Sequence, residues 1–197
     1  MELDKKIAQN LSKVAGEARG VILKTDGEFI LREKGEEGLK KLEKELKELG
    51  FPIDYRQIES MNFYPLGLRI ISLLAIQKVF GFDEQKIKEM GSAAPKVSLV
   101  IKLFMQYFLS LKLIFKQIPR MWHKHYTVGD LVPVELDEEK RIIILRVRNF
   151  NLHPVFCSYI CGYFSEIIKM VVKKTSTCKE RKCFFRGDEY HEYSFNW

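Results

Sequence analysis

The residues whose chemistry is most evident are four cysteines near the C-terminus. They are all the cysteines of the chain: Cys157, Cys161, Cys178 and Cys183. A group of this kind can bind a metal ion, form disulfides or fill a core as small apolar side chains. The N-terminus has no apolar stretch typical of a secretory signal, so we expect a cytoplasmic protein. Thiols stay reduced in that compartment, which favours metal ligands or core residues over disulfides.

The spacing of the cysteines predicts how they could meet. Residues 154–172 are expected to form a helix, which would place Cys157 and Cys161 on one face, one turn apart. Cys178 and Cys183 flank a short polar segment that we expect to form a turn after this helix. Two ligands from a helix and two from a turn can surround a tetrahedral zinc ion, which favours thiolate sulfur. We therefore predict one structural zinc site, with buried cysteines that bind no metal as the alternative.

Composition and charge favour a single soluble domain over residues 1–197 that does not bind nucleic acid. Charged residues make up 30% of the chain, and the net charge is +7. The lysines are spread along the chain and mixed with glutamates, unlike the compact basic patch of a nucleic-acid-binding protein. Residues 97–118 are long and apolar, but three lysines interrupt them, which disfavours a membrane span. We expect a buried helix there, and binding to a membrane surface is the less favoured alternative.

The hydrophobic pattern predicts helices in the first part of the chain. Four leucines at 3-4-3 spacing, from Leu39 to Leu49, predict a helix over 36–49 with one apolar face. Gly20 and Gly27 are expected to interrupt the chain before it. Asp83 is well placed to cap a short helix, and Pro95 to open the long apolar helix.

Strands are predicted after Pro119, which is expected to kink or end the long helix. Residues 130–136 and 141–149 are rich in Val and Ile, and the segment between them suits a hairpin turn. The C-terminal residues alternate well enough for two short strands around Gly187. Helices come first, followed by strands with one helix between them, so we predict an α+β fold with an antiparallel sheet packed against helices.

The stretch "HPVFCSYICGYF" at 153–164 and the cysteine pair after it resemble the C-terminal part of the 4-vinyl-reductase-type small-molecule-binding domain. This domain occurs in hydrocarbon-binding proteins and in the sensor regions of phenol- and xylene-responsive activators. Its pattern contains a Pro, a Cys, a Gly-aromatic pair, then Glu-x-x-Cys and a further Cys. The matching residues here are Pro154, Cys157, Gly162, Tyr163, Cys178 and Cys183.

The resemblance implies zinc ligands at Cys157, Cys178 and Cys183. The acidic ligand of the family would fall on Thr175, which is not a ligand of that kind. Either Cys161 or Glu180 is expected to take its place.

The first part of the chain resembles the heme-based nitric-oxide and oxygen sensor domains, whose fold is shared by vesicle-tethering transport-particle subunits. The likeness lies in residues 19–51 and 80–108. Those sensors take an axial histidine from the region that holds His123 and His125 here, and they bind the heme propionates with a Tyr-x-Ser-x-Arg motif. This chain has "ILRVR" at 144–148 instead, so we expect no heme.

The aromatic-sensor relatives hydrogen-bond their ligand through a Trp and a His, which implies Trp122 and His123 here. Phe108 and Tyr159 are among many aromatic residues that could line an apolar pocket, although a core needs the same residues. The chain has no Gly-rich phosphate loop, no G-x-S-x-G and no HExxH motif, so we expect no enzyme activity.

These observations predict a cytoplasmic sensor or regulatory domain that binds a small apolar or aromatic molecule and carries a structural metal ion. A homodimer or a signalling partner protein would receive its output. Two alternatives remain: a regulatory or trafficking-like scaffold subunit with no pocket ligand, and a heme-based gas sensor.

Overall fold

The computed structural model describes residues 3–97 and 110–197. Contacts within the chain form two compact units, Met1–Lys86 and Ile87–Trp197. Each unit is described by itself, and the single domain expected over 1–197 stays a prediction. Residues 98–109, which include Phe108 and most of the predicted long apolar helix, lie outside the described residues.

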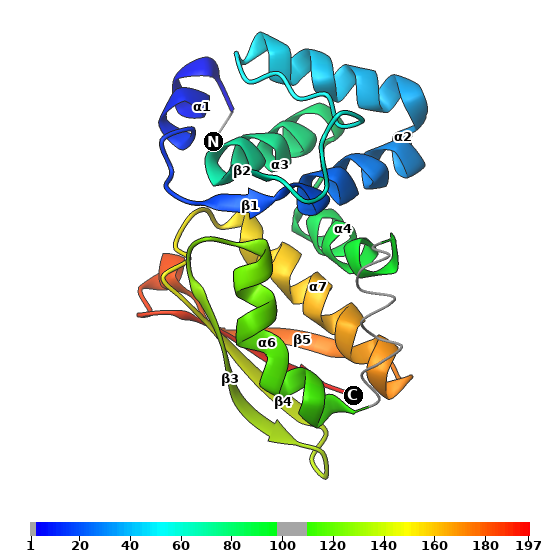
Figure 1. Ribbon diagram of the computed structural model, residues 1–197, viewed down its shortest axis with the longest axis vertical. Helices are drawn as coiled ribbons and strands as arrows, with labels where there is room; N and C mark the ends of the chain where they lie inside the picture. Colours follow the sequence, from blue (N-terminus) through cyan, green and yellow to red (C-terminus); the bar gives the residue numbers. More distant parts are fainter. Residues whose placement is uncertain (1–2, 98–109) are drawn as a thin grey trace. The chain divides into compact units, whose positions relative to one another are not determined.

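The first unit is mainly helical (Figure 1). Its elements are α1 (Lys5–Leu11), β1 (Glu17–Arg19), α2 (Gly20–Glu48), β2 (Phe63–Pro65) and α3 (Leu66–Phe80), followed by the first residues of α4 (Glu84–Val97). β1 and β2 form a small antiparallel sheet, and α2 packs against α3. The leucine face predicted for 36–49 is confirmed, because Leu39, Leu42, Leu46 and Leu49 are all buried. Asp83 accepts a hydrogen bond from the backbone N–H of Lys86 at 2.8 Å, as expected for the N-cap of α4.

The glycines of α2 act differently from the prediction. The helix continues through Gly27. A glycine is needed at this position for packing, because a Cβ there would lie 2.6 Å from the ring of Tyr55. The interruption comes at Gly35, whose φ of +68° is in the left-handed region that favours glycine.

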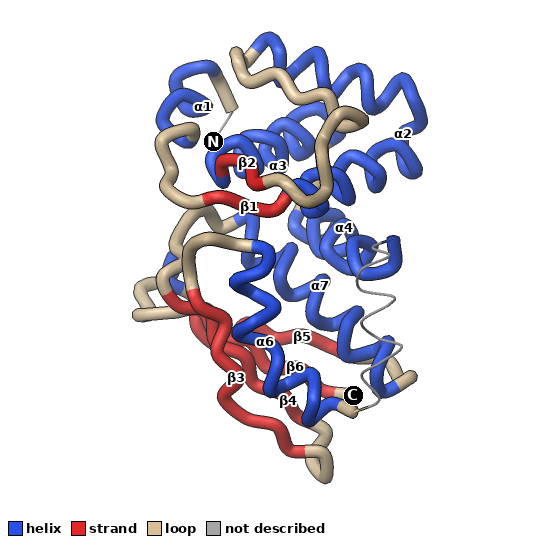
Figure 2. Tube along the Cα trace, in the orientation of Figure 1, coloured by secondary structure: helices blue, strands red, loops and turns tan. Residues whose placement is uncertain are grey.

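The second unit contains a four-stranded antiparallel sheet in the order β3-β4-β6-β5. The strands are β3 (Asp130–Asp137), β4 (Ile142–Arg148), β5 (Thr177–Lys182) and β6 (His191–Asn196). The helices α6 (Leu111–His125) and α7 (Val155–Val172) pack on it, with α6 along β3 and α7 along β5 and β6 (Figure 2). The predicted α+β fold with an antiparallel sheet packed against helices is confirmed, and so are the β3–β4 hairpin and the helix expected over 154–172.

Two expectations in this unit are wrong. α6 continues through Pro119 to His125, so the proline does not end it. The polar segment expected to be a turn is the edge strand β5, in which exposed and half-buried residues alternate. Charged residues are common on edge strands, where they discourage pairing with other chains. Thr177, Lys179 and Arg181 are exposed there, whereas Cys178 and Glu180 are half-buried.

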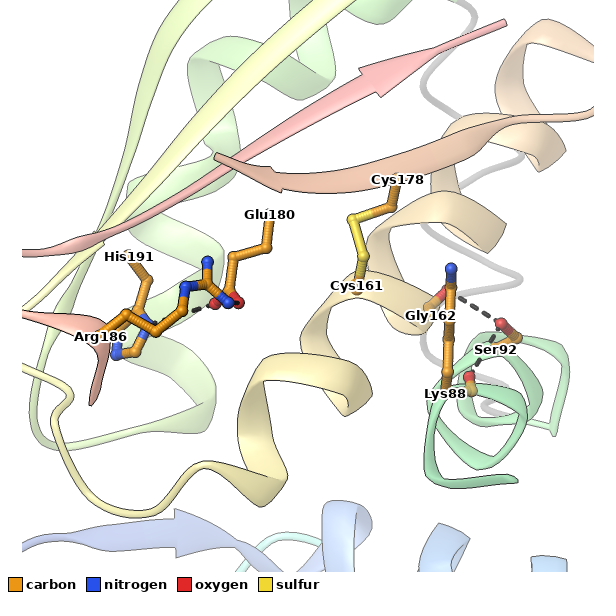
Figure 3. Close-up of a disulfide and its surroundings, with 8 residues drawn as sticks. All are labelled: Lys88, Ser92, Cys161, Gly162, Cys178, Glu180, Arg186 and His191. Atoms are coloured by element: carbon orange, nitrogen blue, oxygen red, sulfur yellow. Dashed lines mark hydrogen bonds and ion pairs between the residues drawn. A yellow bond between two sulfur atoms is a disulfide. The ribbon is translucent and has the colours of Figure 1, made fainter. Parts of the chain in front are cut away.

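Within the second unit, α7 is held closely against the end of α4. A Cβ on Gly162 would lie 1.9 Å from the carbonyl oxygen of Lys88, and one on Gly91 would lie 2.1 Å from that of Tyr159. Ser92 Oγ also donates to the carbonyl oxygen of Gly162 at 3.1 Å (Figure 3). Among the described residues, α7 is long and apolar enough to cross a membrane. Half of it is buried, as in many core helices, so this is weak support for a span.

Candidate functional site

The structure divides the four cysteines between two places. Cys161 of α7 and Cys178 of β5 form a disulfide, with their Cα atoms 5.7 Å apart (Figure 3). Cys157 and Cys183 are free thiols. The predicted four-thiolate site is therefore wrong, because two of its sulfurs are bonded to each other and cannot act as thiolate ligands. The expectation that every thiol is reduced fails for the same pair.

The two free thiols meet a carboxylate and an imidazole. Cys157 Sγ lies 3.9 Å from Cys183 Sγ and 3.8 Å from Nδ1 of His191. Glu180 Oε1 lies 3.5 Å from the same Nδ1. The four donor atoms all lie within 4.8 Å of one another. Two thiolates bound to one tetrahedral ion, each about 2.3 Å from it, would be about 3.8 Å apart, so this spacing fits a shared ion. We call these four residues the donor cluster.

Each member of the donor cluster is positioned by a different element of the second unit. Cys157 lies in the first turn of α7, and Glu180 faces inward from β5 opposite Tyr193. Cys183 directly follows β5, and His191 begins β6. Cys183 and His191 are buried, while Cys157 and Glu180 are half-buried.

Neighbouring residues hold the donor cluster in place. Arg186 Nη1 donates to Oε2 of Glu180 at 2.8 Å, which leaves Oε1 directed toward His191 (Figure 3). The backbone N–H of Cys183 donates to Oδ2 of Asp188 at 2.8 Å and so fixes the turn between β5 and β6. The ring of Phe185 lies 5.4 Å from that of His191.

The electrostatics of the donor cluster match a site for a cation. Burial raises the pKa of the Cys157 thiol, and Glu180 and Cys183 raise it further. Burial also acts to raise the pKa of Glu180, but the neighbouring side chains of His191 and Cys157 and the charge of Arg186 outweigh it, so this pKa is lowered. Oε1 of Glu180 is buried and accepts no hydrogen bond from the described residues. A metal ion would satisfy this oxygen and displace the thiol protons.

Sequence reasoning named Glu180 only as a replacement ligand and missed His191. A signal was present, because Glu180 and Cys183 themselves have the Glu-x-x-Cys spacing. The resemblance placed this spacing five residues earlier, at Thr175 and Cys178. His191 lies 34 residues from Cys157 along the chain, and the pairing of β6 in the sheet brings the two together.

The predicted ligand-binding pair is not brought together. Trp122 is buried, lies in ring contact with Tyr126 and edge-to-face with Phe150, and donates from Nε1 to the carbonyl oxygen of Val128 at 3.1 Å. The side chain of His123 is about half exposed, and its Nε2 lies 3.4 Å from Oδ1 of Asp130. Adjacent residues of a helix point about 100° apart, which separates these two side chains. Tyr159 is buried on α7, and Phe108 lies outside the described residues.

No family model and no curated protein matches this sequence. Solved structures do match it. An H-NOX protein from S. oneidensis in the Fe(II)NO ligation state has a TM-score of 0.68 and 11% identity, over 90% of this chain and 98% of the other. An oxygen-binding H-NOX domain related to soluble guanylate cyclases has a TM-score of 0.64 and 13% identity, over 90% and 94%. A structure that probes heme distortion in the H-NOX family has a TM-score of 0.64 and 14% identity, over 91% and 94%.

These likenesses show that the chain shares the fold of the H-NOX structures. The narrower resemblance to the 4-vinyl-reductase-type domain stays a prediction. The expected cofactors, zinc and no heme, are corrected by the same comparison, since the similar structures come from proteins studied with iron-bound ligands and heme.

Proposed function

We propose that this chain is a non-enzymatic sensor domain that binds a small molecule, and that heme is the first group to test in it. The observation that carries the proposal is the likeness of fold to H-NOX proteins over nine-tenths of the chain. A sensor also requires a partner that receives its signal. The candidates are a second copy of the chain and another protein.

The residues of α6 and the start of the sheet fit heme in part. His123 would be the axial ligand, because histidines that bind metals commonly donate their other ring N–H to a carboxylate, and Asp130 lies 3.4 Å from its Nε2. In the strand that would carry the Tyr-x-Ser-x-Arg motif, Ile144 and Arg146 stand at the first two positions, and only Arg148 keeps the residue type. Arg148 is exposed, pairs in register with Asp130, and has its guanidinium 6.0 Å from the centre of the Tyr190 ring.

The two replaced positions change how a propionate could be held. Ile144 is buried and offers no hydrogen-bond donor. Arg146 is already engaged, because it donates to Glu192 from Nε and Nη2 at 3.2 and 2.8 Å. A propionate would therefore depend on Arg148, as guanidinium groups bind carboxylates strongly. Bound heme would supply an iron that coordinates a gas, while His123 would hold the iron and Asp130 would orient the His123 ring.

The test is a titration of purified protein with hemin, followed by absorption spectroscopy. We expect a Soret band that is lost or shifted in His123→Ala. His125→Ala, which removes a ring two residues further along α6, is the matched control and should keep the band. Loss of the band in His125→Ala alone would move the axial role to His125.

A wild-type protein with no Soret band would contradict the heme proposal. Mass spectrometry of organic extracts from protein purified from its native source then separates the remaining possibilities. A bound apolar or aromatic molecule would support the sensor function with a different ligand. Extracts with no bound molecule would favour the scaffold alternative.

A further inference from the structure

No cationic side chain among the described residues lies at the centre of the donor cluster. Two thiols, an imidazole and a carboxylate converge within 4.8 Å, and the guanidinium of Arg186 binds the outer oxygen of Glu180. Thiolate, imidazole and carboxylate are all ligands of transition-metal ions. These are two sulfurs, one nitrogen and one oxygen, a set that differs from the four thiols expected from the sequence.

The disulfide joins the same two elements that carry half of the donor cluster. On α7, Cys161 lies one helical turn after Cys157, on the same face. On β5, Cys178 lies two residues before Glu180, on the same face of the strand, with Phe195 and Tyr193 as their partners on β6. The Cys161–Cys178 bond therefore links α7 to β5. A metal ion bound to Cys157 and Glu180 would link the same two elements beside it.

Apart from the disulfide, this end of β5 is held through its pairing with β6, a strand that also packs on α7. β5 is an edge strand, and its outward residues are exposed. Its inward position after Cys178 is Glu180, which offers little apolar surface to pack on α7, while Lys182 lies beyond a register shift and binds the hydroxyl of Tyr190. The disulfide is therefore the covalent tie between the segments that carry Cys157 and Glu180.

We propose that the Cys161–Cys178 disulfide controls the affinity of the donor cluster for a transition-metal ion. With the bond intact, the four donors are preorganised, and an ion loses little free energy in ordering them. A dithiol reductant would pass two electrons and two protons to the bond. The S–S bond breaks, Cys161 and Cys178 become thiols, and the reductant forms its own disulfide. β5 stays paired with β6, but its covalent tie to α7 is lost, so Glu180 can move relative to Cys157 and the metal ion is bound less tightly.

This control fits a cell that keeps a reducing interior, where a disulfide persists only when something maintains it. Metal binding then reports whether Cys161 and Cys178 are oxidised or reduced. The proposal goes beyond the sensor function and does not depend on heme, because the donor cluster and the disulfide share no residue with the candidate heme ligands.

The test uses Co²⁺ as the probe, because its thiolate charge-transfer and d–d bands report both binding and the number of sulfur ligands. Three samples are titrated without oxygen: oxidised wild type, wild type reduced and then freed of reductant, and the Cys161→Ser/Cys178→Ser double variant. Mutation of a residue that positions a metal ligand without binding the metal itself typically changes metal affinity by about 10- to 100-fold. We expect the reduced and double-variant proteins to bind Co²⁺ at least about tenfold more weakly than the oxidised protein.

The control variant is His191→Ala, which removes a ligand and leaves the disulfide unchanged. It should lose Co²⁺ binding in the oxidised state, which assigns the binding to the donor cluster. The reduced wild type keeps the test valid if the double variant does not fold. Equal affinity of the oxidised and reduced proteins would overturn the proposal. So would a four-sulfur spectrum in the reduced protein, or an oxidised protein that binds no Co²⁺.

Discussion

Each unit of the protein contains a buried group of ionisable side chains, and the two groups are balanced in different ways. In the first unit, Asp26 of α2 and Arg69 of α3 are fully buried, with Arg69 Nε 3.2 Å from Asp26 Oδ2. In the second, the donor cluster brings together a carboxylate, two thiols and an imidazole. The first group carries both signs of charge within the chain. The second consists of donor atoms for a cation, and no cationic side chain among the described residues lies at its centre.

The difference matters because a buried charge is costly unless it is paired. The charges of Asp26 and Arg69 balance as soon as α2 and α3 pack together, so the pair can serve the fold alone. The donor cluster responds instead to what is bound and to the state of the nearby disulfide. A buried polar group that the chain balances by itself indicates structure, and one that it does not balance indicates a site.

The largest expected effect comes from breaking the balanced pair. Asp26→Ala should lower the free energy of unfolding by about 3–5 kcal/mol, because Arg69 would stay buried without its carboxylate. The double variant Asp26→Leu/Arg69→Met should lose much less, since it leaves no charge behind. Denaturant unfolding followed by circular dichroism measures both. A double variant as unstable as the single one would show that the pair is not the cause.

The same experiment tests whether the two units act as one domain. Both tryptophans, Trp122 and Trp197, lie in the second unit, so tryptophan fluorescence reports that unit alone. If residues 1–197 form the predicted single domain, Asp26→Ala should shift the fluorescence and circular dichroism midpoints together. A shift in circular dichroism alone would show that the units unfold separately.

The second effect comes from the disulfide that holds the unbalanced cluster. Cys161 and Cys178 are 17 residues apart, and a bond closing a loop of about that length adds about 3 kcal/mol by restricting the unfolded chain. Cys161→Ser/Cys178→Ser should lose about this much by fluorescence-monitored unfolding. Reduced wild type is the control and should match the variant. A stable reduced protein would mean that packing alone holds β5 against α7.

The third effect is a difference in response to mild acid. All four histidines lie in the second unit. Burial lowers the pKa of His153, whose Nδ1 accepts from the backbone N–H of Val155. The unfolded chain binds its proton near pH 6.5, so the stability that neutral His153 adds is present above that pH and is lost below it.

We therefore expect the fluorescence-monitored stability to fall between pH 7 and 5.5. The loss should be less than about 1 kcal/mol, because the ring is partly exposed to solvent. His153→Asn keeps a hydrogen-bond acceptor near Val155 but cannot titrate, so it should remove part of this slope. An unchanged slope in His153→Asn would assign it to the other histidines.

The smallest effect is expected at an exposed ion pair, which serves as a reference for the buried pair Asp26–Arg69. Glu37 and Lys40 form an ion pair on α2 whose side chains are mostly exposed. Lys40→Ala should change the free energy of unfolding by less than about 0.5 kcal/mol, because water screens such pairs. A loss of several kcal/mol in this variant would mean that the cost of Asp26→Ala does not arise from burial.

Much of the fold follows from local patterns in the sequence. The leucines of α2, the Val- and Ile-rich runs of β3 and β4 and the apolar run of α7 each specify one element, because each acts over a few turns or one strand. The errors came where a residue had two possible roles. Gly27 was read as a helix breaker, although it makes room for Tyr55, and Pro119 was read as a helix end, although α6 passes through it.

The sequence by itself determined that Cys157 and Cys161 lie on one helical face, since helical periodicity requires it. It also placed the thiols in a region with an acidic residue nearby. Only the tertiary structure decided which cysteines pair. Forming β5 as an edge strand directs Cys178 toward Cys161 and Glu180 toward Cys157, because alternate residues of a strand face the same side. The pairing of β6 with β5 then brings His191 to Cys157, a contact between residues 34 apart that no local pattern encodes.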